Sequence, residues 1–216
     1  MTPTPERLDR LQQQWWHLLR PFGAEAGVVY SAFDELAARY GEPHRHYHTL
    51  EHIGEMLRLV PRLISPGADA VVLQFAVWFH DAVYDAKAGD NELRSAEFAE
   101  ATLVHLSVPA ETATFVAELV RSTDHRIVFD DVRIEFAILH DADLAILGAA
   151  PARYDRYAAD IRLEYAWVPE DAYRAGRSRV LQSFLDRPVL FRTPLMFDEG
   201  ETPARENLTR ELGQLR

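Results

Sequence analysis

Apolar residues recur at alternating three- and four-residue spacing through nearly the whole chain, and this periodicity limits the fold more than any other feature. It is the period of an amphipathic α-helix and not that of a strand. The pattern breaks where Pro, Gly or Asp cluster. It predicts helices at about 4–20, 25–40, 50–64, 69–84, 91–106, 110–124, 132–147, 151–166, 169–186 and 203–215.

Strands have little support in this pattern. The best candidate, Arg126–Phe129, is too short to build a sheet. No linker rich in Gly, Ser or Pro divides the 216 residues, whose number is typical of one domain. The sequence therefore predicts an all-α, single-domain helical bundle over residues 1–216, with a core at about 40–186. The N-terminal helices, a C-terminal strap and a last helix would pack on that core.

The expected strap covers about 187–203. Pro188, Pro194, Gly200 and Pro203 interrupt a mixture of aromatic and acidic residues there. These residues disfavour regular structure, so we expect an extended segment on the surface.

The amino-acid composition argues against several classes of function. There are 23 basic and 34 acidic residues, a formal net charge of −11, so a nucleic-acid polymer is not an expected partner. There is no cysteine, so any metal ion must be held by His, Asp or Glu. No basic stretch followed by an apolar run opens the chain, and no apolar run is long enough for a membrane span. We expect a soluble, cytoplasmic protein without a membrane partner.

A first cluster of ionisable residues lies at 44–52. Thr49 is the expected N-cap of the helix at 50–64, which places His48 just outside that helix and His52 in its first turn. A lone histidine on an apolar helix face is usually a hydrogen-bonded core residue. Here four histidines occur within nine positions, from His44 to His52, which favours a functional cluster.

A second cluster ends the strongly apolar helix expected at 69–84. At 100° per residue, Gln74, Asp81 and Asp85 share one stripe of that helix, with His80 beside them. A carboxylate in an apolar setting is costly unless a charge compensates it. The compensating charge is either a divalent cation or an internal arginine, and the sequence leaves both open.

The third cluster places Asp141 and Asp143 in the apolar helix at 132–147. The two side chains project about 200° apart, so only one can face a given pocket, and geometry alone does not choose between them. Salt bridges are the alternative for both. Together the three clusters offer imidazoles and carboxylates from three helices, as in metal sites of helical bundles. Such a set suits Mn²⁺, Fe²⁺, Zn²⁺, Co²⁺ or Mg²⁺.

The order of four residues on the expected helices resembles the signature of the HD-domain metal-dependent phosphohydrolases. These residues are His52, the His80-Asp81 doublet and Asp143. The strings at 45–52, 78–85, 90–92, 141–148 and 176–177 are similar to a subgroup of stand-alone, predicted phosphohydrolases, over roughly 40–215. The resemblance implies an HD-type all-α fold and one divalent ion, with Mn²⁺ or Mg²⁺ favoured. Its ligands would be His52, His80, Asp81 and Asp143, with Asp141 as the alternative to Asp143.

The resemblance further implies hydrolysis of a phosphate ester or anhydride of a small molecule, for which we favour a nucleotide, by a metal-activated water. Alarmone hydrolases in this superfamily continue the doublet as H-D-x-x-E-D. Here Tyr84 replaces the Glu, which argues against an alarmone substrate, and Asp85 keeps the Asp.

Further residues are candidates for the reaction itself. Asp85 is a candidate general base one helical turn beyond Asp81, or else a helix-terminal surface acid. His125 is a candidate to protonate the leaving group. Three side chains are expected to bind substrate: Arg45, His48 and Arg177.

Two other interpretations remain. His48 to His52 also matches H-x-x-E-H, the inverted zinc-peptidase motif, which requires all five residues on one continuous helix. A domain of the same kind could instead bind a nucleotide or metal as a sensor, without turnover. The chain could also form a homodimer.

Overall fold

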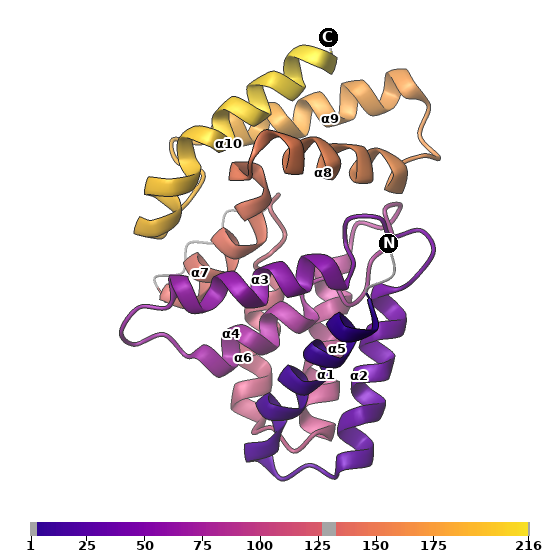
Figure 1. The fold of residues 1–216 in the computed structure, drawn as a ribbon, viewed down its shortest axis with the longest axis vertical. Helices are drawn as coiled ribbons and strands as arrows, with labels where there is room; N and C mark the ends of the chain where they lie inside the picture. The colour runs from indigo at the N-terminus through magenta and orange to yellow at the C-terminus, as the bar shows by residue number, and fades with distance from the viewer. Residues whose placement is uncertain (1–3, 127–132, 216) are drawn as a thin grey trace. The chain divides into compact units, whose positions relative to one another are not determined.

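The computed structural model describes residues 4–126 and 133–215 (Figure 1). Within these residues all regular secondary structure is helical and no strand occurs, which confirms the all-α class. Of the strand candidate Arg126–Phe129, residues 127–129 lie outside the described part. No helix in the described residues combines the length and the apolar character needed to cross a bilayer.

The chain divides into two compact units, Met1–Leu139 and His140–Arg216. The prediction of one domain with its core at about 40–186 stays a prediction. The described helices of the first unit are α1 (Pro5–Leu19), η1 (Arg20–Phe22), α2 (Ala26–Tyr40), α3 (Leu50–Leu63), α4 (Ala70–Phe79), α5 (Asn91–His105) and α6 (Ala110–Arg121). Helix α7 (Ile134–Leu144) starts in this unit and ends in the second. The second unit continues with η2 (Ala145–Gly148), α8 (Pro151–Glu164), α9 (Glu170–Leu185) and α10 (Pro194–Leu215).

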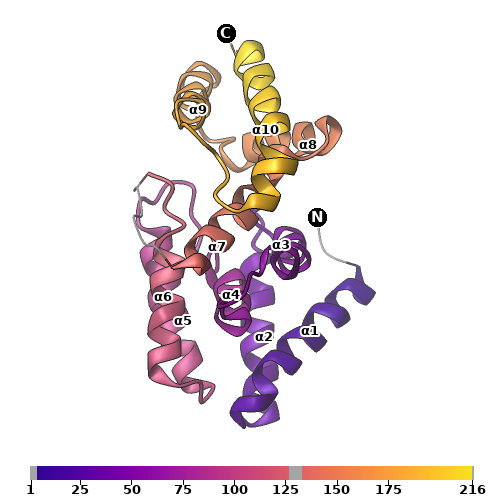
Figure 2. The same cartoon turned by 90° about the vertical axis from the view of Figure 1, so that its left-hand side faces the viewer.

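Helix α4 is the central element of the first unit. It packs against α3, α5 and α6, while α1 and α2 form a helical hairpin (Figures 1 and 2). Trp15 of α1 lies edge-on to Phe75, Trp78 and Phe79 of α4, with ring centroids 5.5–6.3 Å apart, and Phe33 of α2 also contacts Trp78. Such pairs contribute about 0.5–1.5 kcal/mol each beyond their burial. These contacts fix α4, and with it the residues at its C-terminal end.

The expected starts of α3 and α4 are confirmed by their caps. Thr49 Oγ1 accepts a hydrogen bond from the backbone N–H of Glu51, and Asp69 Oδ1 accepts from those of Val71 and Val72. Each cap satisfies N–H groups that lack a partner in the first turn of a helix.

The expected end of α4 at 84 is wrong, because the helix stops at Phe79. The chain then turns, and the carbonyl oxygens of Asp81 and Ala82 accept hydrogen bonds from Arg45 instead of continuing the helix. The Val83 carbonyl accepts from the Ser95 hydroxyl. Asp81 and Asp85 therefore do not form a helical stripe with Gln74.

The expected strap at 187–203 is also wrong. Helix α10 begins at Pro194, and Pro203 lies inside it. Thr193 caps its start: the Thr193 carbonyl accepts from the N–H of Phe197 at 2.9 Å, and its hydroxyl accepts from that of Met196 at 3.4 Å. The residues just before the helix do not run over the surface, since Leu190 and Phe191 are buried.

Helices α9 and α10 lie side by side in the second unit (Figure 2). Gly148 and Gly200 allow η2 and α10 to approach closely, because a Cβ atom on Gly148 would lie 2.9 Å from the carbonyl oxygen of Gly200. This contact explains why a glycine is tolerated inside α10.

Candidate metal centre

The first histidine of the centre is held by the start of α3. The Thr49 cap fixes the first turn, and His52 is the third residue of the helix. Its side chain is buried, with 2% of the residue exposed. His52 therefore belongs to the interior of the first unit.

The second histidine follows directly after α4. His80 is 2% exposed, and its Nδ1 lies 3.0 Å from the carbonyl oxygen of Val77. Since a carbonyl only accepts, Nδ1 carries the proton in this contact. In the neutral ring the lone pair is then on Nε2, which is the form that binds a metal ion.

Two side-chain atoms lie close to Nε2 of His80 within the first unit. Nε2 of His52 lies 3.2 Å from Nε2 of His80, and Oδ2 of Asp81 lies 3.0 Å from the same atom. Two nitrogens bound to one ion at about 2.1 Å, at tetrahedral or octahedral angles, would lie about 3.0–3.4 Å apart. The observed spacing of the two imidazoles therefore fits a shared divalent cation.

Tyr47 supports His52 from the side opposite His80. Its hydroxyl lies 3.1 Å from Nδ1 of His52, and Tyr47 itself is buried. A metal-binding histidine usually uses its second ring nitrogen in such a contact, which fixes the ring orientation. The sequence analysis missed Tyr47. Its place three residues before the start of α3, between two histidines, was the available signal.

The side chains that could supply metal ligands also include Asp143, which is half-buried. This group of side chains could hold a metal ion, and its composition does not identify the metal. Asp143 belongs to the second unit, and its place among the ligands stays a prediction from the sequence motif.

The environment of Asp141, also in the second unit, differs from that of Asp143. It is fully buried, and its carboxylate accepts hydrogen bonds from the backbone N–H groups of Arg192 and Thr193. Its neighbour His140 lies 3.0 Å away through Nδ1. This carboxylate therefore anchors the segment before α10, a role that the sequence did not reveal because the partners are more than 50 positions away.

His48 lies close to the two buried histidines. It is half-buried, and its ring stacks on Tyr84 with centroids 4.2 Å apart and lies 6.3 Å from the His52 ring. The structure thus places this expected substrate-binding residue beside His52 of the candidate metal centre. Arg45 is near as well, but its side chain is fully enclosed by protein.

Asp85 lies in the turn after Asp81 and is exposed. Its Oδ1 accepts from the backbone N–H of Lys87, and its own backbone N–H donates to Asn91. His125 is half-buried in the turn after α6. Their catalytic roles stay predictions, whereas the expected placement of Asp85 on a helix with Asp81 is wrong.

Arg177, the third expected substrate-binding residue, is buried in α9 of the second unit. Its Nε and Nη2 donate to the two carboxylate oxygens of Glu211 at 2.7 and 3.0 Å, and Nη1 lies 3.3 Å from the Tyr157 hydroxyl. Burial acts to lower the pKa of Arg177, but Tyr157 and the bonds to Glu211 together outweigh it and raise that pKa. The arginine thus joins α9 to α10, and its contact with a substrate stays a prediction.

Glu92 lies close enough to Asp81 and Asp124 for their charges to affect its pKa. Burial raises the pKa of Glu92, the charges of Asp124 and Asp81 add to this rise, and Arg126 opposes it. Arg126 lies 3.5 Å from the Glu92 carboxylate and binds both oxygens of Asp124. Arg126 therefore offsets part of the negative charge of Glu92 and Asp124.

The inverted zinc-peptidase arrangement is not formed. Helix α3 begins at Leu50, so His48 lies outside it, and Thr49 caps it. Glu51 forms an ion pair with Arg7. The motif requires His48, Glu51 and His52 on one continuous helix, and this requirement is not met.

In comparisons with known proteins, no family model, no curated protein and no solved structure matches the chain. The function is therefore inferred from the chemistry of the residues described above.

Proposed function

We propose that the protein is an HD-type, metal-dependent phosphohydrolase that cleaves a phosphate ester or anhydride of a small molecule, with a nucleotide as the favoured substrate class. The observation that carries the proposal is the convergence of His52, His80 and Asp81. Two buried imidazoles with a carboxylate 3.0 Å from one of them form a borderline-hard ligand set. The order of these residues along the chain is that of the HD-domain signature.

Asp143 completes the proposed ligand set. The alternative, Asp141, already accepts three backbone hydrogen bonds in the second unit. Moving that carboxylate onto an ion would leave buried N–H groups without partners, which is costly. This cost supports Asp143 over Asp141. The ion would be Mn²⁺ or Mg²⁺, with Fe²⁺, Zn²⁺ and Co²⁺ as alternatives.

When bound, a divalent ion would polarise the phosphoryl group and lower the pKa of a water molecule. His80 would bind the ion through Nε2, because its Nδ1 lies 3.0 Å from the Val77 carbonyl oxygen and carries the proton there. Asp85, four positions after Asp81, would accept the proton of the attacking water, and His125 would donate one to the leaving oxygen. His48 would contact the substrate beside the ion.

The test is a hydrolysis screen with added Mn²⁺ or Mg²⁺ over nucleotides and generic phosphate monoesters and diesters. It compares the wild type with Asp81→Ala, and uses Asp34→Ala, an exposed aspartate on α2, as the matched control. We expect metal-dependent turnover in the wild type and the control, and none in Asp81→Ala.

The same preparations separate the alternatives. Metal content near one ion per chain, lost in His80→Ala and Asp81→Ala but without any turnover, would support the sensor. Metal retained in both variants but lost in His48→Ala and Glu51→Ala would support the zinc peptidase. A wild type that binds no divalent ion would overturn the proposal.

A further inference from the structure

Arg45 has the most enclosed guanidinium in the neighbourhood of the candidate metal centre, with 0% of its side chain exposed. Its Nη1 donates to the Asp81 carbonyl oxygen at 2.6 Å and its Nη2 to that of Ala82 at 3.2 Å. Nη1 also lies 3.4 Å from the His48 carbonyl oxygen, and Nε donates to Glu42 at 2.9 Å. Four bonds to protein oxygens nearly use up the five N–H groups of a guanidinium.

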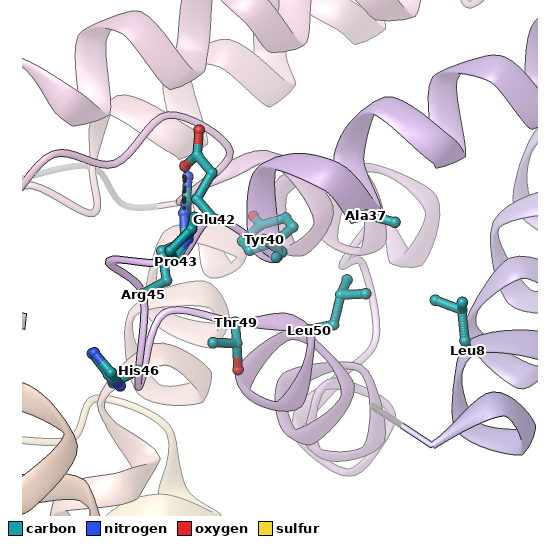
Figure 3. Close-up of a pocket in the computed structure, with 10 residues that line it drawn as sticks. Leu8, Ala37, Tyr40, Glu42, Pro43, Arg45, His46, Thr49 and Leu50 are labelled. Atoms are coloured by element: carbon teal, nitrogen blue, oxygen red, sulfur yellow. Dashed lines mark hydrogen bonds and ion pairs between the residues drawn. The ribbon is translucent and has the colours of Figure 1, made fainter. Parts of the chain in front are cut away.

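Aromatic rings and a carboxylate hold this guanidinium in place. The Tyr40 and Tyr84 ring centroids lie 5.2 and 5.5 Å from its central carbon. Glu42 offsets its charge, and Figure 3 shows the two side chains in contact. A planar cation suits this setting because it can donate in its plane and contact rings with its faces.

The bonds of Arg45 join the two chain segments that carry the candidate ligands. One segment, 42–48, leads into α3 and His52, and the other, 80–82, follows α4. Helix α4 has ended at Phe79, so the carbonyl groups of Asp81 and Ala82 have no helical partners. Arg45 supplies these partners, and thereby fixes the backbone on which the Asp81 side chain stands.

We propose that Arg45 is a positioning residue that holds Asp81 against His80, and that it does not clamp the phosphate of a substrate. The inference rests on the proposed metal-dependent function. A phosphate clamp would need N–H groups turned toward the substrate, whereas those of Arg45 are bound to the protein. Loss of the guanidinium would release the 81–82 turn and weaken metal binding, even before a substrate is present.

A cavity beside Arg45 makes the proposal testable by chemical rescue. It has a volume of about 350 Å³ and is lined by residues of α1, α2, α3 and the 41–49 loop, with Arg45 in its wall (Figure 3). Replacing Arg45 by alanine would extend this cavity into the space of the guanidinium. A free guanidinium ion is small enough to enter it and to bind the same carbonyl oxygens.

The experiment measures the Mn²⁺ dissociation constant of the full chain by titration calorimetry, with circular dichroism to verify the fold. We expect Arg45→Lys and Arg45→Ala to bind Mn²⁺ about 10–100-fold more weakly than the wild type. Guanidinium at millimolar concentration should restore affinity in Arg45→Ala, and equal ionic strength of sodium chloride should not. Arg39→Ala is the matched control, since Arg39 also pairs with a carboxylate and covers a ring. Arg39→Ala should bind Mn²⁺ with the affinity of the wild type, and guanidinium should not change that affinity.

Two outcomes would overturn the inference. Wild-type Mn²⁺ affinity in both Arg45 variants, with a raised KM and unchanged kcat for a substrate, would assign Arg45 to phosphate binding. Weaker Mn²⁺ binding in Arg45→Lys without rescue of Arg45→Ala by guanidinium would point to general loosening of the fold. A wild type that binds no Mn²⁺ would instead remove the proposed function, on which the positioning role depends.

Discussion

The Tyr47 hydroxyl lies 3.1 Å from Nδ1 of His52, and both residues are buried. Nε2 of His52 faces His80 at 3.2 Å. When Nε2 of His52 uses its lone pair for a cation, the ring proton stays on Nδ1, and the Tyr47 oxygen is its acceptor. In that form of His52, the Tyr47 hydroxyl would stabilise the ring by accepting from Nδ1–H.

Replacing Tyr47 by phenylalanine removes this acceptor and keeps the ring. A buried Nδ1–H without its acceptor disfavours the metal-binding form, so Tyr47→Phe should bind Mn²⁺ about 10–100-fold more weakly in titration calorimetry. Tyr154→Phe is a suitable control, because Tyr154 is also a buried phenol but bonds to Glu211. Equal Mn²⁺ affinity in Tyr47→Phe and the wild type would contradict the role of the hydroxyl.

Replacement by asparagine should have different effects on stability and metal content at the two aspartates of α7, Asp141 and Asp143. In Asp141→Asn an NH₂ group would face the N–H groups of Arg192 or Thr193, so we expect a loss of about 2–3 kcal/mol in the free energy of unfolding, measured with urea. Asp143→Asn should keep most of its stability and lose metal. The reverse result, with metal lost in Asp141→Asn at unchanged stability, would make Asp141 the ligand.

At low pH, Asp124 should no longer contribute to the stability of the folded protein. Hydrogen bonding from the Arg126 side chain lowers the pKa of Asp124 from its usual 3.8. A lowered pKa stabilises the folded protein above the usual value, and this stabilisation is lost as the pH falls through the pKa of the folded state. Asp124→Asn should therefore lower Tm at pH 7, and the difference from the wild type should shrink below about pH 4. A difference in Tm that stays constant down to pH 3 would show that the carboxylate charge is not what stabilises this turn.

The parts of the fold that depend on local signals could be predicted from the sequence. The all-α class follows from periodicity, and the start of α3 follows from Thr49, whose hydroxyl needs only the next turn of the chain. The cap of α10 was visible too, because Thr193 followed by Pro194 is typical of an N-cap and first helical position. It was overlooked because Gly200 and Pro203 were given more weight, although their contacts allow them inside a helix.

The rest could not be predicted because it depends on distant partners. Helix α4 ends at Phe79 where Arg45, more than 30 positions earlier, takes up the next carbonyl groups. Asp141 is bound by Arg192 and Thr193, which no local pattern links to it. In the candidate centre, His52 and His80 were predicted from their residue clusters and from the resemblance to the HD-domain signature, whereas the contact with Tyr47 needed the three-dimensional structure.

The final prediction concerns Asp85, which stands exposed in the turn that follows Asp81. Asp85→Asn keeps the size of the side chain and the oxygen that accepts from the Lys87 N–H, so the turn and the metal content should survive. It removes the basic site, so kcat with the substrate found in the screen should fall about 10²–10⁴-fold if Asp85 is the sole general base, as proposed. Full turnover in metal-loaded Asp85→Asn would leave His125 as the next candidate to move the proton. Loss of metal together with turnover would show instead that the turn at Asp85 supports the position of Asp81.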